Sequence, residues 1–423
     1  MTQQKTLANG ARVVLAPFSG TEAAAILVLF KIGSRNEDVP VWGGSHFIEH
    51  LMFKGTERRP RTVDISQELD RYGAQYNAYT GKDLTGYWVK IAAPQLPVAV
   101  DLLHDMLFHS KFDAEEMDRE KRVIIEEIKM YEENPIMHIE DLLEEAMFNG
   151  HVLWKNIAGT ADSMRAMTRE DVLKYRDTFY RSENMVIVAA GNLPENVLEL
   201  VESTFGTVEK RDGVIPADVL LGDQAAVGRI RRQQKDVEQV QLSLGFPTIK
   251  RGHADEAPLR LLASILGGTM SSRLFVEVRE RRGLCYTVRA ATDSYQDTGM
   301  LTVRAGLDAT RLSEAMQVIT DELRKAAQDG VTEAELRMVK DNVRGGLSLA
   351  LEDSSDRAEF YARQLLFLGT VEEPADRLAR YDAVMLEDVA RVAKNYLRFD
   401  RMSLAAIGPF ASDDELAALL PKV

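Results

Sequence analysis

Two histidines and a glutamate lie close together in the segment His46-Phe47-Ile48-Glu49-His50. On a helix, positions 46 and 50 lie one turn apart on the same face, so both imidazoles can reach one ion. Glu49 follows His46 by three residues and can contact a water molecule held there. Zinc binds histidine nitrogens and keeps an open coordination position in catalytic sites. The pattern therefore predicts a zinc site that activates water, although two histidines can also fall four residues apart by chance.

A catalytic zinc site needs a third protein ligand, commonly a carboxylate. The best candidates lie in a predicted helix at residues 118–128, where Glu120 and Glu127 are seven residues apart and share one face. Apolar residues on that face indicate that it turns inward, where a metal ion would offset the cost of a buried carboxylate. Glu126 lies about 100° away and is expected to be solvated. The spacing leaves open which glutamate binds the ion, or whether both lie on an exposed face.

The elements that must position these residues occur twice, which indicates an internal duplication. In each half, two predicted strands precede a helix: residues 12–15, 24–31 and 43–54 in the first half, and 228–232, 239–246 and 257–266 in the second. Both halves mix amphipathic helices with strands of alternating polarity. The sequence therefore predicts an α+β fold of two similar, duplicated domains, each a sheet backed by helices.

The domain boundary is predicted in a segment with Gly, Pro and charged residues but no periodicity. We predict an N-terminal zinc-binding domain at residues 1–207, a linker at 208–233 and a second domain at 234–423. In the second domain, the positions that match His46, Glu49, His50 and Glu127 hold groups that cannot bind an ion: Leu259, Leu262, Ala263 and Gly346. One Zn²⁺ per chain is therefore expected.

Composition excludes several classes of function. The chain has 423 residues and a formal net charge of −14, which disfavours general binding to nucleic acid or anionic membranes. Its longest apolar stretch, residues 23–30, is too short to cross a bilayer, and no targeting segment is visible. The single cysteine, Cys285, excludes an intrachain disulfide framework and favours a reducing, cytoplasmic location. The basic runs at 58–61 and 279–282 are expected to be solvated.

Taken together, these motifs resemble the pitrilysin/insulinase family of zinc metallopeptidases, with its inverted HxxEH motif. The resemblance rests on residues 46–50, on Glu127 within 120–127, and on the flanking segments 33–37 and 51–56. It covers nearly the whole chain, whose length is similar to that of the smaller bacterial, processing-peptidase-like branch. It implies mainly antiparallel sheets and the following site residues: His46, His50 and Glu127 as zinc ligands, Glu49 as general base, and Glu120 as a carboxylate that orients the site.

The resemblance also implies two further sets of site residues. Residues 73–80 resemble the family's edge strand for the substrate backbone, with Asn77 and Ala78 at the matching positions, so they would pair with an extended peptide. Arg279 and Tyr286 resemble an Arg-Tyr element that completes the active site from the domain without zinc, contacting substrate carbonyls and the developing oxyanion. An ordinary strand and a solvated helix end are the alternatives.

The expected function is that of a zinc-dependent endopeptidase hydrolysing unfolded peptides or small polypeptides in an enclosed dimer chamber. One chain carries both the zinc motif and the Arg-Tyr element, so a homodimer without a specialised partner is expected, in a bacterial cytoplasm. One alternative is a non-catalytic structural or assembly subunit related to processing-peptidase-like core proteins; the intact metal motif argues against it. Another is a zinc enzyme of different chemistry, such as a lyase, which the duplication and the Arg-Tyr element disfavour.

Overall fold

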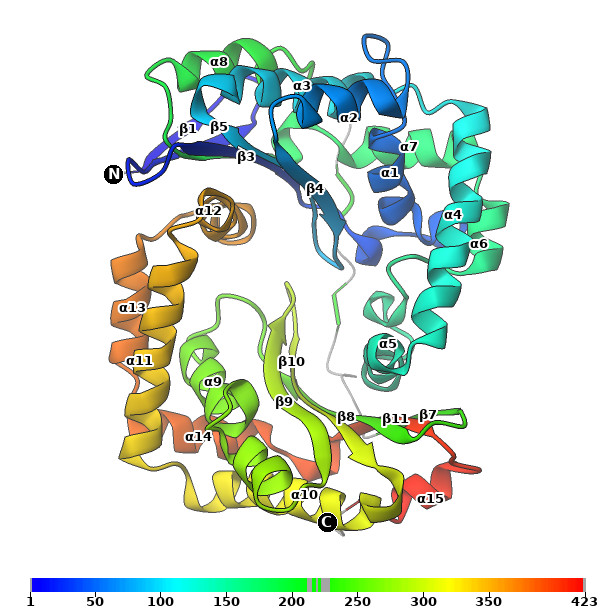
Figure 1. Cartoon of the computed structure of the whole chain (residues 1–423), viewed down its shortest axis with the longest axis vertical. Helices are drawn as coiled ribbons and strands as arrows, with labels where there is room; N and C mark the ends of the chain where they lie inside the picture. Colours follow the sequence, from blue (N-terminus) through cyan, green and yellow to red (C-terminus); the bar gives the residue numbers. More distant parts are fainter. Residues whose placement is uncertain (1, 211–214, 218–219, 222–228, 421–423) are drawn as a thin grey trace. The chain divides into compact units, whose positions relative to one another are not determined.

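The computed structural model describes residues 2–210, 215–217, 220–221 and 229–420, and Figure 1 labels its elements. Contacts divide the chain into two compact units, which interleave along the sequence. The first unit comprises Met1–Ile128, Asn156–Val219 and Gly346–Glu372, and the second Lys129–Lys155, Leu220–Gly345 and Glu373–Val423. The domain limits 1–207 and 234–423 stay a prediction about the duplicated sequence. Within the predicted linker 208–233, residues 211–214, 218–219 and 222–228 lie outside the described residues.

A six-stranded sheet forms the centre of the first unit, in the order β1-β2-β6-β3-β5-β4. Its strands are β1 (Gln3–Thr6), β2 (Arg12–Pro17), β3 (Ala23–Phe30), β4 (Gln75–Thr80), β5 (Thr85–Ala92) and β6 (Met185–Gly191). Only β2 and β6 run parallel; all other neighbours are antiparallel. The apolar β3 lies between β5 and β6, whereas β4 pairs only with β5 among the described strands and forms an edge.

Helices cover both faces of this sheet. On one face, Ile26 and Val28 of β3 belong to a core shared with most helices of the unit. These helices are α1 (Gly44–Met52), α2 (Thr62–Asp70), α3 (Leu96–His109), α4 (Ala114–Glu133), α6 (Ala161–Ala166), α7 (Arg169–Phe179) and α8 (Val197–Phe205). The alternate residues Leu27 and Leu29 point to the other face, as strand geometry requires, and pack against α12 (Ser354–Leu368) (Figure 1).

Polar contacts fix α12 on the first sheet. Lys90 of β5 forms an ion pair with Asp353, which caps the first turn of α12. The Tyr79 hydroxyl of β4 donates a hydrogen bond to Glu359. A helix from residues 354–368 is therefore part of the unit whose sheet comes entirely from residues 3–191.

The second unit repeats the arrangement with a five-stranded sheet, in the order β7-β11-β8-β10-β9. Its strands are β7 (Ile230–Gln234), β8 (Gln239–Thr248), β9 (Cys285–Ser294), β10 (Gly299–Asp308) and β11 (Ser403–Gly408). This order matches β2-β6-β3-β5-β4, and again only the first two strands of the series are parallel. The predicted α+β fold of two duplicated, mainly antiparallel sheets backed by helices is confirmed.

The second sheet is also covered on both faces. One face packs against α9 (Glu256–Ala263), α10 (Leu312–Asp329), α11 (Glu333–Ala350), α13 (Pro374–Asp382), α14 (Leu386–Tyr396) and α15 (Asp413–Ala417). The other face packs against α5 (Pro135–Phe148), whose Ile139 and Leu143 contact Ala405 and Ile407 of β11 (Figure 1). Each sequence half thus contributes a helix to the unit built on the other half's sheet, α5 in one case and α12 in the other.

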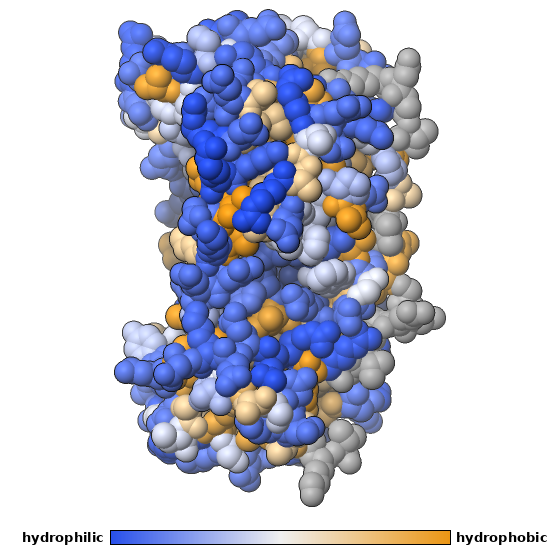
Figure 2. Space-filling model, turned by 90° about the vertical axis from the view of Figure 1, so that its right-hand side faces the viewer, coloured by the Kyte–Doolittle hydropathy of each residue, from blue (hydrophilic) through white to orange (hydrophobic). Residues whose placement is uncertain are grey.

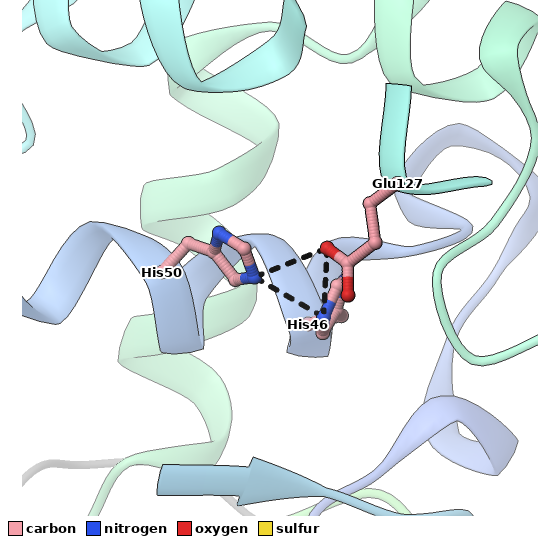
Figure 3. A group of neighbouring side chains, drawn as sticks. All are labelled: His46, His50 and Glu127. Atoms are coloured by element: carbon pink, nitrogen blue, oxygen red, sulfur yellow. Dashed lines mark hydrogen bonds and ion pairs between the residues drawn. The ribbon is translucent and has the colours of Figure 1, made fainter. Parts of the chain in front are cut away.

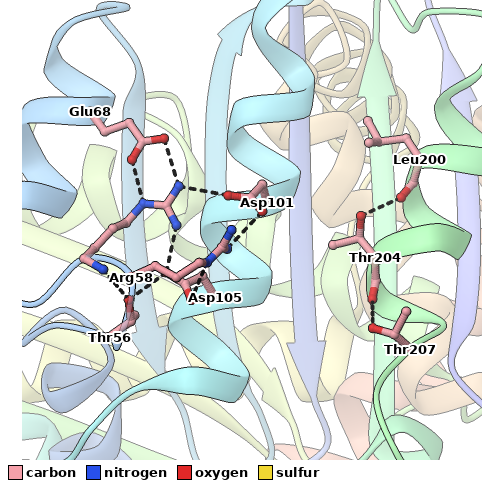
Figure 4. A network of polar contacts seen from close by, with 9 residues as sticks. Thr56, Arg58, Glu68, Asp101, Asp105, Leu200, Thr204 and Thr207 are labelled. Carbon is pink, nitrogen blue, oxygen red and sulfur yellow. Dashed lines mark hydrogen bonds and ion pairs between the residues drawn. The ribbon is translucent and has the colours of Figure 1, made fainter.

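One of the two basic runs differs from expectation. Arg59 is buried, and its guanidinium donates hydrogen bonds to the carboxylates of Glu68, Asp101 and Asp105. Figure 4 shows these three carboxylates, with Arg58 also directed at Asp101 and Asp105. The prediction of a solvated run is wrong for Arg59, because three acidic partners offset the cost of burying its charge.

Hydrophilic side chains predominate on the face of the molecule shown in Figure 2, with apolar residues scattered among them. Within the described ranges, no helix combines the length and the apolar character that crossing a membrane would require.

Candidate metal centre

Helix α1 carries the motif on its exposed side. Phe47, Ile48 and Leu51 are buried in the core of the first unit, whereas His46 and His50 are only partly buried. The helix begins after Gly43, whose φ of 91° lies in the left-handed region that favours glycine. The amphipathic sequence therefore anchors one face of the helix and presents both imidazoles on the other.

Three potential ligand atoms converge between α1 and α4 (Figure 3). His46 Nε2 lies 3.2 Å from His50 Nε2, and Glu127 Oε2 lies 3.8 Å and 3.6 Å from these two nitrogens. Ligands about 2.0–2.1 Å from a tetrahedral zinc ion would be separated by about 3.3 Å. Two imidazoles and one carboxylate are also a donor set that zinc uses in catalytic sites. The residues present therefore fit a zinc ion, and the structure brings together all three predicted ligands.

A buried carboxylate and a lysine lie behind His50. Glu120 accepts a hydrogen bond from His50 Nδ1 at 2.8 Å and forms an ion pair with Lys54 Nζ at 2.6 Å. Burial raises the pKa of Glu120, but the His50 and Lys54 contacts outweigh that effect, so its pKa lies below the ordinary value. An ionised Glu120 requires the proton of His50 on Nδ1, which leaves the Nε2 lone pair for an ion.

His46 lacks such a partner. Its Nδ1 is buried and has no hydrogen-bond partner in the described part of the chain. Burial, followed by the nearby His50, lowers the pKa of His46 to about 4, so the imidazole is neutral at neutral pH and can act as a ligand. The orientation of His46 thus depends on the backbone of α1 more than that of His50 does.

Glu49 is held by the end of the edge strand. The Thr80 hydroxyl donates a hydrogen bond to the Glu49 carboxylate at 2.5 Å. Burial raises the pKa of Glu49 above its ordinary value, although the Thr80 hydrogen bond and His50 oppose that rise. A carboxylate with a raised pKa beside potential metal ligands is suited to accept and return a proton.

The predicted substrate strand lies at the sheet edge. In β4, Asn77 is exposed and Ala78 is buried, and these residues are paired with Trp88 and Tyr87 of β5. The backbone N–H of Ala78 donates to the Asn77 side-chain oxygen at 2.9 Å. A strand with one unpaired edge can pair with a further strand. In β4, the side-chain oxygen of Asn77 already accepts the hydrogen bond of one backbone donor, the N–H of Ala78.

Arg279 and Tyr286 lie side by side in the second unit. The Arg279 guanidinium lies 4.7 Å from the Phe275 ring centroid and 5.4 Å from that of Tyr286, which is 68% exposed. Arg281 and Arg282 form ion pairs with Glu277. In the ranges described, the Arg279 guanidinium lies near these two rings and Cys285 and forms no hydrogen bond or ion pair. Its N–H groups are therefore available to a ligand. The role of Arg279 and Tyr286 toward the centre in the first unit stays a prediction.

Sequence reasoning assigned no role to two residues of this centre, Lys54 and Thr80. Lys54 follows His50 by four residues, a spacing that suggests a shared side of the chain but not a shared partner on α4. Thr80 reaches Glu49 only because β4 and α1 pack together, 31 residues apart in sequence. Neither contact had a local sequence signal.

Two family models match most of the chain. Residues 12–161 match the model of the insulinase family, peptidase family M16, and residues 166–343 match that of the peptidase M16 inactive domain. A Bacillus subtilis protein named as an uncharacterized zinc protease is 36% identical over 97% of this chain and 98% of its own length. A Mycobacterium tuberculosis protein, also named as an uncharacterized zinc protease, is 37% identical over 98% of this chain and 94% of its own length.

A solved structure shares the fold as well. The crystal structure of a Helicobacter pylori protease has a TM-score of 0.92 and 25% identity, and covers 97% of this chain and 99% of that one. The chain belongs to peptidase family M16, the insulinase family of zinc proteases. The three converging ligand-type residues fall within the part matched by the insulinase model. The inactive-domain model matches a range that contains strands β7 to β10 of the second sheet.

Proposed function

We propose that this chain is a zinc-dependent endopeptidase that hydrolyses unfolded peptides or small polypeptides. One observation carries the proposal: His46, His50 and Glu127 direct three ligand atoms at one point, beside a glutamate whose pKa is raised. These three residues would hold one ion per chain. A bound zinc ion would supply Lewis acidity, which polarises a carbonyl oxygen and makes water easier to deprotonate.

The chain's own residues account for the proton transfers. Glu49 takes a proton from the attacking water as its oxygen bonds to the scissile carbonyl carbon. Glu49 then returns that proton to the amide nitrogen as the C–N bond breaks, which releases an amine and a carboxylic acid. Thr80 keeps the Glu49 carboxylate oriented during both transfers. Glu120 and Lys54 hold His50.

An extended peptide would bind along β4 as an added antiparallel or parallel strand. Its carbonyl oxygen would replace the Asn77 side chain at the N–H of Ala78. Arg279 and Tyr286 would supply N–H and O–H donors to substrate carbonyls. This role is supported by the Arg279 guanidinium, which forms no hydrogen bond or ion pair within the described part of the chain. One chain carries both the metal-site residues and the Arg-Tyr element, so a dimer of two identical chains would suffice to enclose a chamber. Such a chamber would select substrates by size.

The second candidate is a non-catalytic structural or assembly subunit. The match of residues 166–343 to an inactive-domain model favours it, because most of the second half up to residue 343 lies in this range, and the second half lacks metal-binding side chains at the equivalent positions. The intact centre in the first half favours the peptidase instead. The two proposals differ in one measurable respect, because only a peptidase hydrolyses added peptides.

The test is cleavage of a mixed set of quenched fluorogenic peptides by zinc-loaded protein. Wild type should cleave, whereas chelator-treated protein, Glu49→Gln and Glu127→Gln should not. The matched control is Glu126→Gln, which changes the exposed neighbour of Glu127 and should retain activity. Wild-type protein that bound one zinc ion per chain and cleaved nothing would overturn the peptidase proposal in favour of the subunit.

A further inference from the structure

The segment before α1 contains charged residues that are almost completely buried. In residues 33–37, Arg35 is 1% exposed and Glu37 is 2% exposed. Burying a charge is costly unless the group is paired and hydrogen-bonded. Nothing in the proposed chemistry uses either residue directly, so their burial calls for a structural explanation.

One end of this segment is fixed to the turn between β4 and β5. The backbone N–H groups of Ser34 and Arg35 donate to the carbonyl oxygens of Gly81 and Lys82, each at 3.1 Å. The Arg35 guanidinium also forms an ion pair with Asp83 at 2.8 Å, and both side chains are buried.

Glycine is required where the segment meets this turn. A Cβ atom on Gly33 would lie only 2.3 Å and 2.4 Å from the carbonyl oxygens of Gly81 and Lys82. The chain segment and the turn are therefore in close backbone contact. This turn directly follows Thr80, the residue that holds Glu49.

The other end of the segment is fixed to the start of α1. The Glu37 carboxylate accepts hydrogen bonds from the backbone N–H of Gly43 at 2.7 Å and of Ser45 at 2.8 Å. The first N–H groups of a helix have no partner within the helix, and they carry its positive end, so a carboxylate is a strong partner for them. Because Gly43, the residue at the N-cap, has no side chain, Glu37 supplies the cap from six residues earlier.

A buried tyrosine from α7 completes this attachment. The Tyr175 hydroxyl lies 2.9 Å from the Ser45 hydroxyl and donates to the Gly33 carbonyl oxygen at 3.3 Å. The first turn of α1 is thus held by Glu37 and Tyr175 together.

His46 directly follows Ser45 in that first turn. His50 is oriented by Glu120, but His46 has no hydrogen-bond partner at Nδ1 among the residues described. Apart from the neighbouring ligand-type groups of His50 and Glu127, the backbone of the first turn sets its position. We propose that Glu37 is a positioning residue for zinc binding, which fixes the first turn of α1 and, through that turn, His46. This inference rests on the proposed zinc site.

The test is the substitution Glu37→Gln. The oxygen of the new side-chain amide could accept one of the two N–H groups, but its NH₂ group would face the other. Zn²⁺ affinity, measured by competition with a chromophoric chelator, should fall about 10- to 100-fold, the range seen when groups that orient metal ligands are lost. Glu37→Asp keeps the charge on a shorter side chain and should show a smaller loss. If Glu37→Gln does not fold, the zinc affinity of Glu37→Asp tests the positioning role of Glu37 instead.

A control separates positioning from general destabilisation. Asn9 is buried in the same unit and hydrogen-bonds to the backbone of Phe205 and Val208, away from α1. Asn9→Ala should lower the melting temperature while leaving zinc affinity unchanged. In Co²⁺-substituted protein, Glu37→Gln should alter the visible absorption spectrum in the same direction as His46→Ala, whereas Asn9→Ala should not.

The outcomes separate the two proposals. A Glu37→Gln protein with a lower melting temperature but wild-type zinc affinity and Co²⁺ spectrum would overturn the role of Glu37 alone. A wild-type protein that bound no Zn²⁺ would overturn both this inference and the zinc site. Because no readout depends on peptide cleavage, failure of the peptidase proposal leaves this result interpretable.

Discussion

Helices α1 and α9 occupy matching places in the two halves but bury their surfaces differently. In α1, the positions of the motif hold His46, Glu49 and His50 on a partly exposed side. In α9, the equivalent residues are Leu259, Leu262 and Ala263, all buried among apolar neighbours. The second sheet nevertheless has the strand order of β2-β6-β3-β5-β4 in the first, which adds β1 at one edge. The fold therefore does not need the polar residues, and α1 gives up packing that α9 retains.

The starts of the two helices differ in the same way. The Glu37 carboxylate accepts hydrogen bonds from the N–H groups of Gly43, the N-cap of α1, and of Ser45 in its first turn. Before α9, Asp255 forms an ion pair with Arg391 and accepts a hydrogen bond from Tyr396, both on α14. The acidic residue thus caps the helix in the half with metal-ligand side chains, and binds a neighbouring helix in the half without them. The helix whose start accepts a side-chain carboxylate is the one that carries His46.

The largest difference between the two helices is expected when Glu49 of α1 and its counterpart Leu262 of α9 are each substituted: the first should affect activity and the second stability. Glu49→Gln should lower kcat/KM about 10²- to 10⁴-fold, the usual contribution of a general base, with zinc bound and thermal stability unchanged or slightly higher. Leu262→Ala should lower the free energy of unfolding by about 2–5 kcal/mol through a core cavity, with zinc affinity unchanged. Peptide kinetics, zinc titration and chemical denaturation measure these effects. Equal effects of both substitutions on activity would break the comparison between the helices.

A smaller effect, on zinc affinity, is expected from Glu120, which hydrogen-bonds to the candidate ligand His50. Gly346 matches Glu127, and seven residues before it Val339 stands where the first half has Glu120. Glu120→Gln should weaken Zn²⁺ binding about 10- to 100-fold by loosening His50. Chelator competition measures the change, and Glu115→Gln, an exposed carboxylate on the same helix, is the control. Unchanged zinc affinity in Glu120→Gln would show that His50 needs no support from α4.

The smallest effect concerns a pair of acidic residues that open the long helices of the two halves. Arg273 pairs with Glu335, and that contact, outweighing burial, lowers the pKa of Glu335 from 4.5 to about 2. In the first half, Glu116 pairs with the largely exposed Arg119. Glu335→Gln should cost about 1–2 kcal/mol near pH 7, less than the full pKa shift implies because solvent screens the pair. Glu116→Gln should cost less than about 0.5 kcal/mol.

The sign of the pH dependence follows from the lowered pKa. A carboxylate with a lower pKa in the folded than in the unfolded state stabilises the fold above its unfolded pKa, and that contribution disappears as the pH falls through the folded value. The difference in melting temperature between wild type and Glu335→Gln should therefore be constant above about pH 5 and shrink between pH 4.5 and 2. A difference that stayed constant down to pH 2 would contradict an ionic origin.

Much of the predicted metal site follows from the spacing of residues within single helices. The i, i+4 histidines and the seven-residue separation of Glu120 and Glu127 follow from helix geometry, and the structure places all four side chains on facing sides of α1 and α4. Spacing could not decide which glutamate faces the ligand atoms, because that depends on how α4 is rotated and shifted against α1. The family resemblance supplied this assignment, and Glu127 does lie with the two Nε2 atoms.

Contacts between distant segments could not be predicted. Thr80 meets Glu49 and Glu37 meets the start of α1 through packing that no short pattern encodes. The docking of α12 on the first sheet joins Lys90 to Asp353, 263 residues apart. An amphipathic helix can be recognised from its periodicity, but the sheet that receives it cannot. For this reason, sequence halves and compact units differ along this chain.

The position of α12 has a consequence for synthesis of the protein on the ribosome. All described strands of the first sheet exist once Gly191 has been made. In the part of the chain that the structure describes, the helix that covers Leu27 and Leu29 is α12, which is complete only at Leu368. During that interval the nascent chain exposes an apolar sheet face, the kind of surface that aggregates or recruits chaperones. The first unit therefore completes its folding only when the second half of the chain is almost finished.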